Sequence, residues 1–352
     1  GMVHARAGGR PPYLDPEVEL CVGDVRDADA VREALRDVDF VCHLAAAVGV
    51  GQSMYEIAHY TSMNGTGTAV VLEALIHKPV QRLVTASSMS IYGEGLYRTA
   101  DGTLVPDARR TVEQLGAGAW EPVDGSGRPL EALPTPETKI PSLQSVYALT
   151  KYDQERLCLL TGRAYGIPTV ALRFFNTYGP RQALGNPYTG VLAIFAAHFL
   201  AGRSPMIYED GLQRRDFVSV HDVARACRLA LETPNLPADP MNAVFNIGSG
   251  EPYTVREVCE RLAALLGSSL KPTIESTYRA GDIRHCYADL GRAATVLGYV
   301  PQVSFTAGLT ELVGWLEEQR HHHEAEAPDV LERARTELAA KRLVTTAREG
   351  GT

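Results

Sequence analysis

Short apolar runs alternate with longer amphipathic stretches along the first half of the chain. The apolar runs are five or six residues long, as in strands buried on both faces of a sheet, and the stretches between them repeat their apolar residues at helical spacing. We therefore expect strands over 18–22, 39–44, 82–86 and 169–173, and helices over 29–35, 54–76 and 146–165. Strands that alternate with helices are typical of βαβ units with right-handed crossovers. The pattern predicts an α/β fold with a doubly wound parallel sheet.

Two regions interrupt this alternation. Residues 94–144 have no clear period and contain six prolines with several glycine turn signals, which indicates a functional insertion, a lid or a small hairpin. After Asn176 the pattern predicts a smaller α/β lobe, with helices over 191–201 and 255–266 and a short run near 271–276. The expected division is a first domain over 1–175 that also receives about 216–250, a lobe over 176–320 and a tail over 321–352.

The tail is rich in charged residues and carries one more helical pattern, over about 329–343. Leu331, Ala334 and Leu338 recur at helical spacing and form a single apolar stripe. One stripe on an otherwise polar helix predicts a face that packs against the body of the protein.

Composition excludes several classes of protein. No run of 18 apolar residues exists, so no segment is expected to span a membrane, and without a secretory leader we expect a cytoplasmic protein. The net charge of -8, from 34 basic and 42 acidic residues, disfavours binding to the phosphates of nucleic acids. The six cysteines have no C-x-x-C spacing, so we expect free thiols and no metal site.

Tyr147 and Lys151 stand four positions apart at the start of the helix expected over 146–165. Residues at this spacing share a helix face, so the ammonium is expected beside the phenol. A neighbouring cation favours the phenolate and lowers the pKa of a tyrosine from about 10 toward neutral pH, where it can act as a general base. With 15 tyrosines and 5 lysines in the chain, the spacing alone fits an exposed pair on a helix equally well.

Ser88 follows the strand expected over 82–86, at the edge where an open parallel sheet binds its ligands. Its hydroxyl can both donate to and accept from a substrate hydroxyl. Serine, tyrosine and lysine in this order resemble the extended short-chain dehydrogenase/reductase family, in its nucleotide-sugar epimerase and dehydratase branch. The resemblance covers about residues 18–318 and implies a Rossmann-type fold. Further matching stretches are GDVRD at 23–27, HLAAA at 43–47, NGTGT at 64–68, RFFNTYGPR at 173–181, QRRDFVSVHDV at 213–223 and RAGD at 279–282.

The resemblance implies roles for individual residues, with NAD as the cofactor of the first domain and a UDP- or dTDP-linked sugar as the substrate of the lobe. The implied catalytic residues are Ser88, Tyr147 and Lys151. The implied cofactor-binding residues are Asp24, Val25, Leu44, Ala45, Ala46, Asn64 and Lys151. The implied substrate-binding residues are Ser88, Ser90, Asn176, Val191, Arg215, Arg279 and Asp282. A pair of arginines suits a diphosphate because planar guanidinium groups match its oxygens.

The residues after the active hydroxyl distinguish the reactions of the family. By resemblance, dehydratases carry an Asp-Glu pair there to eliminate water, whereas this chain has Met89 and Ser90. This leaves an NAD-dependent 4-epimerase that works through a transient 4-keto sugar, with Tyr147 as acid and base. A 4-ketoreductase using the same groups is the alternative enzyme. The resemblance also implies a homodimer paired through the helices over 54–76 and 146–165.

The dinucleotide fingerprint is missing from the sequence. No glycine pair extends to G-x-G-x-x-G, G-x-x-G-x-x-G or G-x-x-x-x-G-K, the loops that hold a pyrophosphate at a helix N-terminus. By resemblance, the residues before the strand expected over 18–22 correspond to the segment after the family's second strand, so a first βα unit is expected to be absent. A sugar-nucleotide-binding protein without redox activity is therefore the alternative of another class.

Overall fold

Four parallel strands form the central sheet of the protein. The computed structural model describes residues 10–182, 190–279, 281–323, 336–341 and 343–347. The strands are β1 (Phe40–His43), β2 (Arg82–Ser88), β6 (Thr169–Phe174) and β10 (Val244–Ile247). They lie in the order β1-β2-β6-β10. Parallel neighbours need crossover connections, and these connections place helices on the faces of the sheet.

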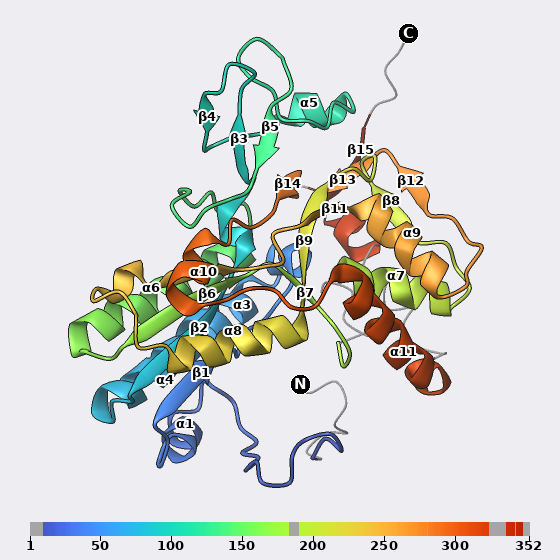
Figure 1. Cartoon of the computed structure of the whole chain (residues 1–352). Helices are drawn as coiled ribbons and strands as arrows, with labels where there is room; N and C mark the ends of the chain where they lie inside the picture. The colour runs from blue at the N-terminus through green and yellow to red at the C-terminus, as the bar shows by residue number, and fades with distance from the viewer. Residues whose placement is uncertain (1–9, 183–189, 280, 324–335, 342, 348–352) are drawn as a thin grey trace.

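Helices cover both faces of this sheet (Figure 1). One face carries α4 (Gly67–His77) and α6 (Val146–Tyr165), and the other carries α8 (Val220–Glu232) and α10 (Gly291–Leu297). Consecutive strand residues point to opposite faces, so Leu83 of β2 packs with the first pair of helices and Val84 with the second. The doubly wound parallel sheet expected from the sequence is confirmed.

The strand expected over 18–22 is wrong. These residues have no regular secondary structure, and Val18 and Val22 are 46% and 73% exposed. A strand needs a neighbour to complete its ladder of hydrogen bonds, and among the described residues β1 pairs with β2 only. For the same reason β1 is not buried on both faces, and the side chain of Phe40 at its start is exposed.

Helices of the first domain begin and end near their expected positions. The N-cap of α1 (Ala28–Ala34) is Asp27, whose carboxylate accepts two backbone N–H groups of the first turn. α6 has its expected bounds, with Ser145 as the N-cap. The helix expected over 54–76 is divided into α3 (Ile57–Tyr60), the π-helical segment η1 (Thr61–Thr66) and α4, and a further short helix, α2 (Val50–Ser53), precedes it. Two short 3-10 turns are η2 (Met89–Tyr92) and η3 (Pro240–Asn242).

A second α/β lobe lies beside the sheet. Its core gathers large apolar side chains, among them Phe195, Phe217, Leu262 and Leu309. Its helices are α7 (Val191–Leu200), α9 (Val255–Leu265) and α11 (Phe305–His323). Its strands are β7 (Asn176–Tyr178), β8 (Met206–Tyr208), β9 (Arg214–Ser219), β11 (Pro252–Thr254), β12 (Thr273–Glu275), β13 (Thr277–Arg279) and β14 (His285–Cys286). Strand β9 pairs with β7, β11 and β14, and β8 pairs with β12.

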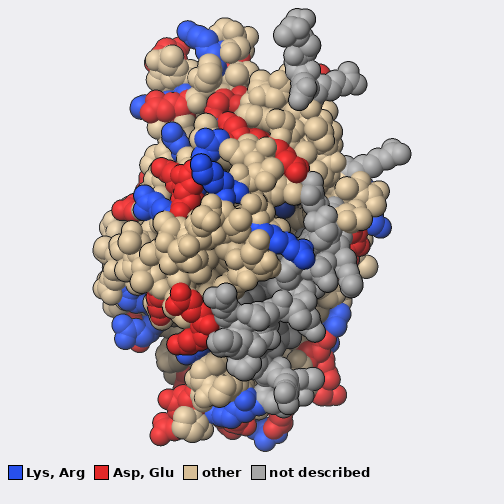
Figure 2. Space-filling view, turned by 90° about the vertical axis from the view of Figure 1, so that its right-hand side faces the viewer, with Lys and Arg blue, Asp and Glu red and all other residues tan. Residues whose placement is uncertain are grey.

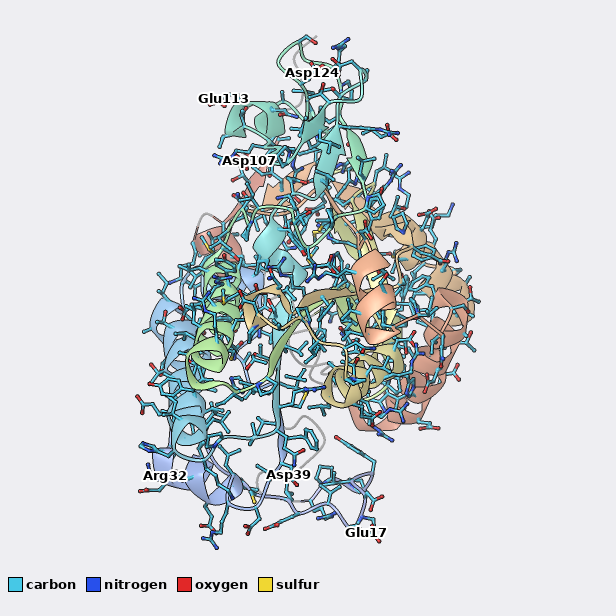
Figure 3. The ribbon with its side chains drawn as sticks, turned by 60° about the vertical axis from the view of Figure 1, so that its left-hand side comes forward. Glu17, Arg32, Asp39, Asp107, Glu113 and Asp124 are labelled. Atoms are coloured by element: carbon cyan, nitrogen blue, oxygen red, sulfur yellow. The ribbon has the colours of Figure 1, made fainter. Side chains whose placement is uncertain are left out.

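Residues 94–144 build a small sheet of their own, which projects from the body (Figure 1). Its antiparallel strands are β3 (Leu96–Arg98), β4 (Leu104–Val105) and β5 (Glu131–Leu133), and the helix α5 (Val112–Gly116) lies between β4 and β5 in the chain. Its small core consists of Tyr97, Ala108 and Leu130. Asp107, Glu113 and Asp124 mark the projection, at the opposite end of the molecule from Asp39 (Figure 3).

The structure describes part of the expected tail helix. Of residues 329–343 it describes 336–341 and 343, and 336–340 are helical. Leu331 and Ala334 lie outside the described residues, whereas Leu338 is buried. The last element is β15 (Val344–Thr346), which pairs with β13.

The charged side chains of the surface are mixed in sign. On the face shown in Figure 2, basic and acidic residues are interleaved and no broad basic area stands out. All six cysteines are free, and among the described residues no group of three His, Cys, Asp or Glu side chains is placed to hold a metal ion. No helix in the described part of the chain is long and apolar enough to cross a membrane.

Candidate active site

A cavity of about 580 Å³ lies at the carboxyl ends of β2 and β6, between the central sheet and the lobe. The predicted site residues that line it are Leu44, Ala46, Ser88, Ser90, Tyr147, Lys151, Asn176, Val191, Arg215, Arg279 and Asp282. The predicted site residues outside its lining are Asp24, Val25, Ala45 and Asn64. Motifs that are far apart in the sequence meet in one place because parallel strands end at the same edge of a sheet.

Tyr147 and Lys151 lie on the inner face of α6, where both side chains are buried. The N-cap Ser145 fixes the start of this helix, and Ser53 accepts a hydrogen bond of 2.9 Å from the backbone N–H of Tyr147. Ser88, at the end of β2, lines the same cavity, and its hydroxyl donates to Oγ of Ser90 at 3.1 Å. These contacts bring a hydroxyl, a phenol and an ammonium to one end of the cavity.

The predicted lowering of the pKa of Tyr147 by Lys151 is wrong. Burial of the phenol raises its pKa, and the hydrogen bond with Ser88 opposes this effect only in part. The Nζ atom of Lys151 donates elsewhere, to the carbonyl oxygen of Ala86 at 2.6 Å and to Oε1 of Gln154 at 2.5 Å. Burial also lowers the pKa of Lys151 to about 8. Loss of hydration therefore outweighs the hydrogen bond with Ser88 at Tyr147 and the charges of Cys158 and Glu155 at Lys151.

A fully buried glutamine holds Lys151 in this position, and sequence analysis missed it. Besides accepting from Lys151, Gln154 donates through Nε2 to Oγ1 of Thr68 at 2.8 Å and to the carbonyl oxygen of Ala45 at 3.2 Å. His43 joins this network, with Nε2 2.9 Å from the Thr68 oxygen. Burial and the Lys151 ammonium lower the pKa of His43 to about 4, so its imidazole is neutral near pH 7. The sequence signal that could have identified Gln154 is its spacing, since it follows Lys151 by one helical turn and so shares a face of the helix with it.

Asn64 is fully buried and does not line the cavity. Its Oδ1 accepts from the backbone N–H of Ala47 at 2.7 Å, and its Nδ2 donates to the carbonyl oxygen of Ala47 at 3.1 Å and to Thr150 at 3.0 Å. Asn64 thus ties the segment after β1 to α6 and holds Leu44 and Ala46 in place. A direct contact between Asn64 and NAD stays a prediction.

Asp24 and Val25 stand apart from the cavity. The carboxylate of Asp24 lies 2.5 Å from the guanidinium of Arg26, whose hydrogen bonds lower the pKa of Asp24 to about 2. Val25 packs against Gly67, where an added Cβ would come within 2.6 Å of Cγ2 of Val25. Gly67, the second glycine of the NGTGT stretch, is therefore needed for close packing. The binding of adenine by Asp24 stays a prediction.

Arg215 faces the cavity from the strand β9. Its Nη1 donates to the carbonyl oxygens of Arg214 and Arg284, both at 3.0 Å, and its Nη2 donates to that of Ile283. These partners are neutral carbonyl groups, so they orient the guanidinium without cancelling its charge. The arrangement leaves Arg215 able to attract an anion in the cavity.

Arg279 is the second arginine in the wall of the cavity, beside Arg215 in the lining. Its Nε donates to the carboxylate of Asp282 at 3.0 Å, and its guanidinium lies over the ring of Tyr208, 5.2 Å from the centroid. Nearby in the lining, Oδ1 of Asn176 and Oε1 of Gln213 are buried without a hydrogen-bond partner among the described residues. A buried acceptor left unpaired is costly, so both oxygens fit a ligand that donates hydrogen bonds.

A buried network of charges stands behind this wall, and sequence analysis missed it as well. The side chain of Arg284 is fully buried, and its guanidinium contacts Glu209 at 3.0 Å, Asp210 at 2.6 Å and Glu121 at 2.6 Å. Glu121 belongs to the insertion, whereas the other partners belong to the lobe. The network therefore anchors the projecting insertion to the lobe.

Arg110 makes the second anchor of the insertion. Its guanidinium contacts Glu94 at 3.1 Å and Glu209 at 2.7 Å, and its Nη2 donates to the carbonyl oxygen of Asp282 at 2.8 Å. Asp282 lies in the cavity lining next to Ile283, whose carbonyl holds Arg215. The insertion thus reaches the cavity through the backbone of the segment that lines it.

The comparison with known proteins decides the family. The model of the NAD dependent epimerase/dehydratase family matches residues 2–248. The chain belongs to this family. A dTDP-L-rhamnose 4-epimerase of Burkholderia thailandensis is 36% identical to this member over 323 residues, which cover 90% of this chain and 86% of that protein. A putative UDP-glucose 4-epimerase of Methanocaldococcus jannaschii is 30% identical over 310 residues, which cover 88% and 87%.

Solved structures of epimerases share the fold of this family member. The UDP-glucose 4-epimerase of Thermotoga maritima, solved with UDP-glucose, superposes with a TM-score of 0.71 at 29% identity and covers 89% of each chain. The UDP-glucose 4-epimerase of Thermus thermophilus, solved with NAD, gives a TM-score of 0.67 at 29% identity and covers 88% of each chain. The Rossmann-type fold implied by the sequence is confirmed.

Proposed function

We propose that this protein is an NAD-dependent nucleotide-sugar 4-epimerase that acts on a UDP- or dTDP-linked sugar through a transient 4-keto sugar. The observation that carries the proposal is one cavity with Ser88, Tyr147 and Lys151 at one end and Arg215 and Arg279 in its wall. The first group suits proton transfer at a sugar hydroxyl, and the second suits the diphosphate of a nucleotide. The 4-epimerases among its relatives support the same reaction.

Tyr147 serves as both acid and base in the proposed reaction. Its phenolate takes the proton of the sugar hydroxyl as hydride leaves the same carbon, and its phenol returns that proton when hydride comes back to the other face of the ketone. NAD+, when bound, accepts and returns this hydride. Ser88 hydrogen-bonds to the reacting oxygen and orients it. Because burial favours the neutral phenol, we assign to the Lys151 ammonium, once released from Gln154, the charge that stabilises the phenolate.

The cavity offers surfaces for both ligands. Leu44 and Ala46 give an apolar surface for a nicotinamide ring, and we propose that Lys151 holds the neighbouring ribose. Asn176, Val191, Arg215, Arg279, Asp282 and Ser90 are the proposed contacts of the nucleotide sugar. The cofactor roles of Asp24, Val25, Ala45 and Asn64 rest on family membership, since these residues do not line the cavity.

Two measurements test the proposal. Mass spectrometry of the purified, denatured protein is expected to release NAD. Incubation with UDP-glucose or dTDP-L-rhamnose is then expected to produce the 4-epimer without a net change in NADH absorbance. Stoichiometric consumption of NADH would instead identify a 4-ketoreductase. Binding of the nucleotide sugar without NAD and without conversion would identify a sugar-nucleotide-binding protein.

We also infer that the protein is a homodimer paired through α6 and the helices before it. Apolar side chains on these helices are exposed, with exposed fractions of 53% for Ile57, 53% for Leu149, 42% for Leu160 and 55% for Tyr165. Light scattering is expected to give the mass of two chains, and the double variant Leu149→Asp, Leu160→Asp to give the mass of one. We place the enzyme in the cytoplasm, which the six free thiols support.

A further inference from the structure

We propose that residues 336–341 and 343–347 form one wall of the nucleotide-sugar cavity, and that Leu338 shapes the end that receives the sugar. The inference rests on the proposed function, because it takes a nucleotide sugar as the occupant. Leu338 is 5% exposed and lines the cavity together with Tyr147 and Arg279. A residue of the tail therefore lines the same cavity as the proposed acid/base and one of the proposed diphosphate-binding arginines.

The helical part of this segment lies against the first domain. The hydroxyl of Tyr55 donates to Oε2 of Glu337 at 3.1 Å, and Nζ of Lys341 lies 5.5 Å from the centroid of the Tyr55 ring. Tyr55 stands in the turn between α2 and α3, two residues after Ser53, which accepts from the backbone N–H of Tyr147. The contact places Leu338 near the catalytic end of the cavity.

The last strand of the segment belongs to the lobe. β15 pairs antiparallel with β13, with Val344 opposite Arg279, and the two strands lie side by side in Figure 1. The backbone N–H of Ala347 donates to the carbonyl oxygen of Ser276 at 2.7 Å, and Ala347 is buried. The segment is thus attached to the first domain at one end and to the strand that carries Arg279 at the other.

The exposure pattern shows which face of the segment meets the cavity. Among the described residues 336–341, Leu338 is buried, whereas its neighbours Glu337 and Ala339 are exposed. An isobutyl group offers no hydrogen bond, so a hydroxyl or a carboxylate placed against it would lose its hydration without compensation. The wall therefore selects sugars that present a carbon face or a methyl group there, and a 6-deoxy sugar is expected to bind better than a uronic acid.

Tryptophan substitutions at two neighbouring positions test this placement. Leu338→Trp puts a large side chain into the cavity, whereas Ala339→Trp puts it on the exposed face of the same turn. Titration calorimetry measures binding of UDP-glucose and dTDP-L-rhamnose, and of UDP and dTDP as the bare nucleotides. Because overpacking an apolar site is costly, Leu338→Trp is expected to weaken binding of the nucleotide sugar about tenfold or more and binding of the bare nucleotide less than about twofold. Ala339→Trp is expected to change neither more than about twofold.

The outcomes separate this inference from the proposed function. Failure of the unchanged protein to bind any of the nucleotide sugars would contradict the proposed function. Equal effects of the two tryptophan variants, or equal weakening of nucleotide sugar and bare nucleotide, would contradict the wall at the sugar end. If Leu338→Trp loses its cooperative melting, Leu338→Ala decides. This variant is expected to weaken binding of the nucleotide sugar about threefold and to leave binding of the bare nucleotide unchanged, because only the sugar loses an apolar contact. No difference between those two ligands would contradict the inference.

Discussion

Lys151 and Arg215, on the two sides of the cavity, are held in place by different kinds of interaction. On the first-domain side, Lys151 is held by the amide of Gln154 and a backbone carbonyl, in a network of amides, hydroxyls and a neutral imidazole. On the lobe side, the segment behind Arg215 is held by the buried ion pairs of Arg284 and Arg110 with carboxylates.

This difference separates proton transfer from charge binding. A lysine held by neutral groups gains no ion pair to offset its burial, so its pKa falls to about 8 and it can respond to a ligand. An arginine stays charged at any working pH, and carboxylates placed behind the wall keep the geometry of the binding arginines fixed. Reactive groups and binding groups thus need opposite surroundings within one cavity.

The largest expected effect concerns the neutral side. Tyr147→Phe removes the proton carrier and keeps the ring, so turnover is expected to fall by about 10² to 10⁴-fold. Binding of the nucleotide sugar is expected to remain within about threefold, because the lobe side supplies the charged contacts. Steady-state kinetics and calorimetry measure the two effects. Turnover close to that of the unchanged protein would remove Tyr147 from the mechanism.

The ionic side is expected to matter most for stability. Arg284→Met removes one of the two arginines that contact the buried Glu209 and the arginine that contacts Asp210 and Glu121, and the free energy of unfolding is expected to fall by about 3–5 kcal/mol. Arg98→Met, within the insertion that the network anchors, removes an exposed pair with Glu131 at 2.7 Å and is expected to cost about 0.2–1 kcal/mol. Urea denaturation followed by circular dichroism compares the variants. Similar losses for both would show that the buried network does not anchor the insertion.

Arg215 is expected to supply the positive charge that binds the diphosphate of the nucleotide. Arg215→Gln removes the cation and is expected to weaken binding of UDP or dTDP by about 10- to 150-fold, the usual range for a hydrogen bond to a charged group. The matched control is Arg214→Gln, because Arg214 is exposed and points to the other face of β9. Calorimetry with the bare nucleotides measures both. A loss of affinity shared by the two variants would indicate general attraction by positive charge.

The neutral side is expected to make stability depend on pH through His43. The pKa of His43 is about 4 in the folded protein and 6.5 in the unfolded chain, so between these values only the unfolded chain binds the proton. The free energy of unfolding therefore keeps its full value above pH 6.5. It falls as the pH drops from 6.5 to about 4, by up to about 1.4 kcal/mol per pH unit. Denaturation at several pH values is expected to show a shallower slope for His43→Gln. An unchanged slope would show that His43 is not buried in its neutral form.

Most elements and much of the cavity could be predicted because they depend on local patterns. The helix α6 is long and has a serine cap, and motifs at strand ends meet because of the parallel sheet. The strand expected over 18–22 failed because a strand depends on a partner that its own residues do not specify. The predicted lowering of the pKa of Tyr147 was wrong because burial depends on the tertiary structure. The Arg284–Glu209 pair joins residues 75 positions apart, and no spacing pattern in the sequence predicts such a contact.

Burial of the ion pairs has a consequence for how the protein responds to ionic strength. Dissolved ions screen charges that face water over about 8 Å at 0.15 M salt, but they screen buried pairs much less. Added salt should therefore weaken the attraction of Arg215 for a diphosphate while the Arg284 network keeps its strength. The charges that draw the ligand in and the charges that hold the cavity in shape are thus exposed to the solvent to different degrees.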